Sequence, residues 1–172
     1  MTDWKKAYGE LEIQGERRKK RTPTAKTIEK FESDTRITLP TSYKEFAEVF
    51  GTDELAGYYR FTVPLGHSDQ YDLATFNETS HGSPGDATWG EYAAPEILEK
   101  VLFFASTIGG ELFAWRTDEV TDSKNSDYAV YRFLRRPKLR EVAKSFEEFF
   151  DKCLKGKLDT FDEPPPKSYL KY

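Results

Sequence analysis

The sequence has few of the residues on which covalent cross-links and metal sites depend. Among its 172 residues there is one cysteine, Cys153, and there are two histidines, His67 and His81. A single cysteine excludes an internal disulfide and is consistent with a reducing compartment. Neither histidine has a cysteine or a second histidine at ligand spacing, so we expect no metal site.

Long apolar runs are also missing. The longest, Val101 to Ala105, is far shorter than the roughly 20 residues of a membrane helix. Residues 1–6 lack the apolar stretch of a secretory signal, so we expect no membrane association and residence in the cytoplasm. Gly109-Gly110 lacks the Gly-Lys-Ser/Thr pattern of a phosphate loop, and the sequence therefore predicts no cofactor.

Aromatic residues are abundant by contrast. The chain has 13 Phe, 10 Tyr and 3 Trp, although apolar residues make up only 37% of it. Large rings bury much area per side chain, and the length is typical of one compact domain. We therefore expect a single hydrophobic core built mainly from rings.

Apolar spacing predicts three longer helices. The first follows Thr22-Pro23, and the second follows Leu39-Pro40 with Ser42 and Glu45 as a capping box. The last begins at a second capping box of Ser145 and Glu148. Its apolar residues recur at i, i+3, i+4, i+7 and i+8, namely Phe146, Phe149, Phe150, Cys153 and Leu154.

Between these helices the pattern favours strands. An alternating stretch from Tyr58 to Leu65 predicts a strand with one buried face. Further strands are predicted at 71–76, 101–105, 111–116 and 128–134, with a turn at 109–110 and a short helix at 95–99. The fold class is therefore α+β, a single domain with a mainly antiparallel or mixed sheet of about five to six strands, covered on one side by helices.

The chain divides into a basic N-terminal extension (residues 1–21), the globular part (22–158) and a proline-rich C-terminal tail (159–172). Four stretches of the globular part follow one another in a fixed order, and the second and the last of them are moderately specific. They are Ile28 to Glu32, Leu39 to Phe46 ending at Gly51, Phe104 to Trp115, and Ser145 to Phe150.

In this order the four stretches resemble the SUKH superfamily, which includes the yeast Smi/Knr cell-wall regulator and many bacterial immunity proteins. The resemblance covers about residues 24 to 156. It implies a helix-flanked sheet and a protein-binding role without catalysis. In a bacterium the family's usual task is to bind and neutralise a protein toxin, whereas the yeast relatives suggest a regulatory scaffold that binds signalling proteins.

The charge is unevenly distributed along the chain. Residues 53–127 carry fourteen acidic and four basic residues. An acidic surface repels nucleic acid and attracts a basic protein, so a basic nuclease-type toxin is the natural cognate partner. The alternative is that these loops are acidic only for solubility.

We selected candidate partner contacts by charge and predicted exposure. Trp89 and Tyr92 are also considered as anchors, because they lie in a predicted loop where no periodicity demands burial, and Trp89 is kept. The selected residues are Asp69, Asp72, Asp86, Trp89, Glu91, Asp118, Glu119, Asp122 and Asp127. No catalytic residue is predicted. A hydrolase with paired carboxylates remains an alternative, and it requires two acids that converge in a cleft with raised pKa values.

Overall fold

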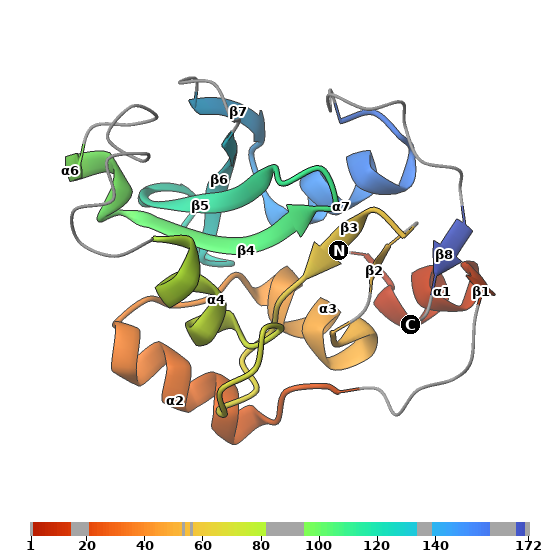
Figure 1. Ribbon diagram of the computed structural model, residues 1–172, viewed down its shortest axis with the longest axis horizontal. Coiled ribbons are helices and arrows are strands. Elements are labelled where there is room, and N and C mark those ends of the chain that lie inside the picture. The colour runs from red at the N-terminus through yellow and green to blue at the C-terminus, as the bar shows by residue number, and fades with distance from the viewer. Residues whose placement is uncertain are drawn as a thin grey trace.

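The computed structural model describes residues 2–14, 21–52, 54–55, 57–81, 95–133, 139–158 and 168–170 (Figure 1). The helices are α1 (Trp4–Gly9), α2 (Ala25–Thr35), α3 (Thr41–Phe50), α4 (Leu73–Ser80), α6 (Pro95–Leu98) and α7 (Phe146–Leu154). The strands are β1 (Glu12–Gln14), β2 (Glu54–Leu55), β3 (Tyr59–Phe61), β4 (Val101–Thr107), β5 (Leu112–Asp122), β6 (Asp127–Phe133), β7 (Leu139–Ala143) and β8 (Ser168–Leu170).

These strands form one sheet in the order β1-β8-β2-β3-β4-β5-β6-β7. The six strands from β2 to β7 are antiparallel neighbours in chain order, and the short β1 pairs with β8 in parallel. The predicted α+β class and its mainly antiparallel sheet are confirmed. Within the described ranges, no helix has both the length and the apolar character needed to cross a membrane.

The closing helix α7 forms as its sequence predicts. The Ser145 side chain accepts a hydrogen bond from the backbone N–H of Glu148 and caps the helix. Phe146, Phe149 and Phe150 are buried on its inner face, because their spacing places them on one side of the helix. Burial of this apolar face holds α7 against the sheet.

Helix α3 lies where it was expected, but the predicted capping box at its start is wrong. The helix begins at Thr41 after Pro40, and no side chain caps it. Ser42 is buried, and the Glu45 carboxylate accepts a hydrogen bond from Trp4 Nε1 at 3.2 Å. Glu45 therefore takes part in a contact across 41 residues and not in a local cap.

The predicted strand at residues 71–76 is also wrong, because this stretch enters α4. Asp72 is the N-cap of α4, and its side chain accepts a hydrogen bond from the backbone N–H of Thr75. This cap satisfies an N–H group that a helix start otherwise leaves unpaired. The cap therefore favours a helix at a stretch that was predicted from the sequence as a strand.

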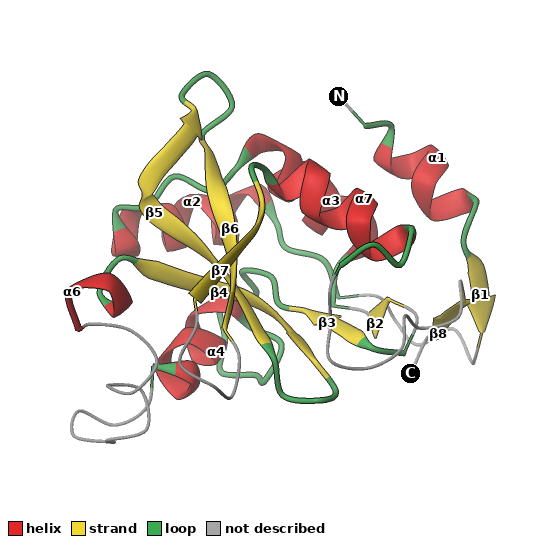
Figure 2. Cartoon of the chain, turned by 90° about the horizontal axis from the view of Figure 1, so that it is seen from above, coloured by secondary structure: helices red, strands yellow, loops and turns green. Residues whose placement is uncertain are grey.

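Helices cover both faces of the sheet, so the prediction of one-sided cover is wrong (Figure 2). On the first face, α3 and α7 cover Leu102, Phe104, Phe113, Trp115 and Val130. On the second face, Phe76 of α4 and two residues of α6 pack against Val101, Phe103, Ala114 and Phe133. The strand β4 is consequently buried on both sides.

The N-terminal helix α1 packs on the first-face side of the core. Trp4 is buried, and its ring lies 5.3 to 6.3 Å from the rings of Phe46, Phe50, Phe146 and Phe150. Such contacts between rings add to the burial of area. The segment before residue 22 therefore contributes a side chain to the hydrophobic core.

Candidate functional site

Six of the nine sequence-selected contact residues lie among the described residues. Asp86, Trp89 and Glu91 lie outside them. Asp69 and Asp72 belong to the loop before α4, three of the others belong to β5, and Asp127 begins β6. The selected acids therefore occupy two separate regions of the fold.

Asp72 is a structural residue at the base of its loop. Only 4% of its surface is exposed, and its Oδ1 accepts hydrogen bonds from the backbone N–H groups of Leu65 at 2.7 Å and Gly66 at 3.1 Å. The predicted exposure of Asp72 is wrong, because a short carboxylate beside a helix start is drawn to these N–H groups. Asp72 fixes the loop to α4.

Asp69 is more exposed and already has a cationic partner. Its carboxylate forms an ion pair with Arg21 and accepts a hydrogen bond from the backbone N–H of Tyr71. The Tyr71 hydrogen bond, followed by the Arg21 contact, lowers the pKa of Asp69. This acid is therefore charged and partly neutralised.

Asp118 and Glu119 belong to a network around Arg116. The guanidinium of Arg116 donates two 2.8 Å hydrogen bonds to Asp118 and lies 3.3 Å from Glu119, which also accepts a 2.6 Å bond from the Tyr131 hydroxyl. The Arg116 bonds hold the pKa of Asp118 at about 2. Burial, followed by the Glu119 bond, raises the pKa of Tyr131 to about 12. Lys100 lies 3.6 Å from Asp118, so bases on the same surface compensate both acids.

Asp122 and Asp127 face each other across the β5–β6 turn and have opposite environments. Asp122 is exposed and accepts hydrogen bonds from the Lys124 backbone N–H and the Asn125 side chain. Asp127 is 7% exposed, and burial raises its pKa. The predicted exposure therefore holds for Asp122 and is wrong for Asp127.

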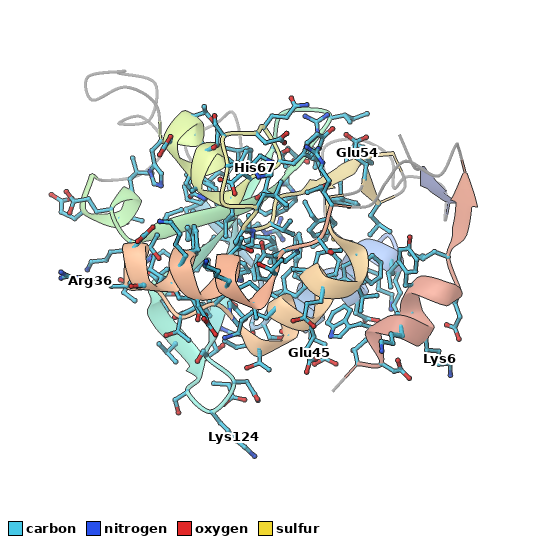
Figure 3. All side chains as sticks on the ribbon, turned by 90° about the horizontal axis from the view of Figure 1, so that it is seen from below. Lys6, Arg36, Glu45, Glu54, His67 and Lys124 are labelled. Atoms are coloured by element: carbon cyan, nitrogen blue, oxygen red, sulfur yellow. The ribbon has the colours of Figure 1, made fainter. Side chains whose placement is uncertain are left out.

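A cavity of about 310 Å³ lies between α2, the loop at residues 64–72 and α4, and we call it the α2–α4 cleft. In Figure 3, His67 marks the loop wall of this cleft. Its lining residues are Thr27, Lys30, Phe31, Asp34, Thr35, Pro64, Gly66, His67, Ser68, Asp72, Ala74, Thr75 and Glu78.

Local sequence explains why these three walls meet. The α2 residues of the cleft lie at i, i+3, i+4, i+7 and i+8 from Thr27, which is one side of a helix. Gly66 has a φ of +74°, and a Cβ there would lie 3.1 Å from Thr27 Cγ2. A glycine therefore permits both the backbone turn and the close approach of the loop to α2.

The cleft combines an apolar wall with exposed charges. Phe31 and Pro64 are buried beneath it, and Lys30 pairs with Asp34 along α2 with side chains that are 64% and 60% exposed. Glu78 of α4 is exposed and has no ion-pair partner among the residues that the structure describes. Chemically, these groups suit a cation better than an anion.

The sequence selection of acids did not identify this cleft, except for Asp72 in its floor. The available signal was the i, i+4 pair of Lys30 and Asp34 on the same side of α2 as Thr27. That spacing indicates a shared surface but does not identify the opposite wall. No group of three or more potential metal ligands occurs in the ranges that the structure describes.

Comparison with known families matches a large part of this fold. The family model described as SMI1 / KNR4 family (SUKH-1) matches residues 22–152. The matched range includes all three walls of the α2–α4 cleft, whereas α1, β1 and β8 lie outside it. No curated protein matches the chain.

Proposed function

We propose that this chain, which belongs to the SMI1/KNR4 family (SUKH-1), is a protein-binding domain that acts without catalytic turnover. More specifically, we propose that it is a cytoplasmic immunity protein of a bacterium, which binds and neutralises a cognate toxin. The family match over residues 22–152 is the observation that carries this proposal.

Exposed acids on α4, on α6 and just after α6 support a basic partner. Glu78, Glu96 and Glu99 are exposed and form no ion pair with any described residue, unlike Asp118 and Glu119 on β5. Uncompensated surface charge accelerates association with a protein of opposite charge and disfavours nucleic acid. A basic nuclease-type toxin is therefore the partner class that this surface favours.

Neutralisation by binding requires only that the domain covers the toxin's active site or substrate groove. The cleft walls rest on buried supports, because Asp72 fixes the loop and Phe31 packs in the core. Preformed surfaces of this kind bind with little backbone rearrangement. We therefore expect the domain to block the toxin's site as a rigid body, without a large change in its own backbone.

The direct test is growth of a host that produces a candidate cognate toxin, to be sought first among the genes beside this one. We expect the wild-type chain to restore growth and to capture the toxin in a pulldown analysed by mass spectrometry. The variant Glu78→Lys should weaken both effects, since it reverses a charge at the cleft. Glu29→Lys is the matched control, because Glu29 is an exposed acid on α2 that does not line the cleft.

The alternative is a regulatory scaffold of the Smi/Knr type. Capture of signalling proteins, together with no restored growth, would favour the scaffold over the immunity role. That the acids of β5 contact the partner stays a prediction, and the same assay tests it. If Asp118→Asn with Glu119→Gln abolishes capture while Glu78→Lys does not, the contact surface lies on β5.

A further inference from the structure

The dimensions and charge of the α2–α4 cleft suggest what it holds. Its volume of about 310 Å³ lies at the lower end of the 300 to 1,000 Å³ that is usual for ligand pockets. A space of this size suits one long side chain better than a large cofactor. We propose that the cleft binds a single arginine side chain of the protein partner, an inference that rests on the proposed binding function.

The charged groups of the cleft are complementary to a guanidinium. Asp34 on α2 and Glu78 on α4 present exposed carboxylates from two walls, and Lys30 is the one lysine among the described residues of the lining. Two carboxylates around one cation site attract a group with several donors. Arginine offers five N–H donors in a planar fork, whereas lysine offers a compact point charge.

The rest of the lining matches the remainder of an arginine side chain. Phe31, Pro64 and Ala74 offer apolar surface for its three methylene groups. Ser68 and Thr75 also line the cleft, and a hydroxyl group has acceptor capacity for further guanidinium N–H groups. Apolar and polar parts of the cleft thus correspond to the two halves of this side chain.

Lys30 competes with the incoming arginine for the carboxylate of Asp34. Its ion pair with Asp34 is mostly exposed to solvent, and exposed pairs of this kind are weak. An incoming arginine can therefore share or replace the contact with Asp34 at small cost. Removal of the Lys30 charge should make the cleft a better cation site.

The test is a titration of the isotope-labelled full chain, followed by NMR, with N-acetyl-arginine methylamide. The corresponding citrulline compound is the matched probe, because it has nearly the same shape without the charge. We expect the arginine probe to shift the amide signals of Gly66, His67 and Thr75, and the citrulline probe to leave them unchanged. These amides lie in the walls of the cleft.

Variants of the cleft sharpen this titration. Glu78→Gln should weaken arginine binding about threefold to fivefold, which is the scale of one exposed ion pair, and Lys30→Met should strengthen it by a similar factor. Glu29→Gln on the outer side of α2 should have no effect. Unaltered chemical shifts and line widths elsewhere show that each variant remains folded.

Three results would overturn the inference: equal shifts with citrulline, shifts confined to other parts of the fold, or no shifts with arginine. A stronger response to the corresponding lysine probe would overturn the choice of arginine.

If the toxin is captured and growth restored while the titration fails, the proposed function stands and this site assignment is wrong. If the titration succeeds and no toxin is bound, the site stands and the immunity role is wrong.

Discussion

The two faces of the sheet are built in different ways. Under α3 and α7, fully buried rings such as Tyr43, Trp115 and Phe146 contact one another at centroid distances of 4.8 to 6.2 Å. Under α4 and α6, the buried cluster is smaller, and Phe76 is only partly buried. The helix α4 covers this second face and also carries Glu78 at the cleft. Aromatic packing is thus concentrated on the first face, and the cleft lies between α4 of the second face and α2, whose Phe31 belongs to the first-face core.

The largest expected effect tests the aromatic face. Phe146→Ala removes a ring at the centre of the first face and should lower the free energy of unfolding by about 3 to 5 kcal/mol. Phe76→Ala on the second face should cost about 1 to 2 kcal/mol, because its ring is only partly buried. Urea denaturation followed by circular dichroism measures both, and equal losses would contradict the contrast between the faces.

The next effect separates two aspartates that the sequence placed in the same class. Asp72→Ala removes the α4 cap and the acceptor for two backbone N–H groups, and should cost about 2 to 3 kcal/mol. Asp122→Ala, in an exposed turn, should change stability by less than about 0.5 kcal/mol. The same urea denaturation checks this pair, and a small effect at Asp72 would show that the loop does not depend on it.

The smallest effect concerns pH and the compensated acids of β5. Because the pKa of Asp118 is about 2, below the ordinary value of 3.8, its pairing stabilises the fold above pH 4 and is lost as the pH falls toward 2. Asp118→Asn should therefore cost up to about 1 kcal/mol at pH 7, with the difference shrinking at pH 2. Thermal denaturation across this range measures it, and high salt should also reduce the difference.

Asp127 is a control for Asp118, because its pKa is shifted in the opposite direction. Burial raises its pKa, so its ionisation disfavours the fold, and its contribution to stability falls as the pH rises from 3.8 through the raised value. Asp127→Asn should remove this loss and leave the variant more stable than wild type at pH 7. A variant that is less stable at pH 7 would show that the charge itself is needed.

The sequence predicted correctly those elements that are specified by residues close together in the chain. The Ser145 cap and the Phe146 stripe specify α7 without help from distant residues. The same kind of signal, Asp72 followed by Thr75, was present before α4, but residues 71–76 were interpreted as a strand. The cap was the better guide, because it satisfies a backbone N–H group that the start of a helix leaves unpaired.

Contacts between distant segments explain what the sequence did not reveal. Glu45 accepts its hydrogen bond from Trp4, and the cleft requires α2 to meet a loop about 40 residues later. The ion pair of Asp118 could have been predicted from the sequence, since Arg116 lies two residues away on the same side of the strand. A count of acidic residues along the chain therefore overstated how many carboxylates are left for a partner to contact.

The position of Trp4 has a practical consequence for recombinant work. A fragment trimmed to residues 22–152 would lack this ring and leave Phe46, Phe50 and Phe150 without their cover. Contiguous exposed apolar area of this kind promotes self-association. We expect such a truncated fragment to precipitate or to form oligomers that the longer chain avoids, and a light-scattering comparison of the two would reveal it.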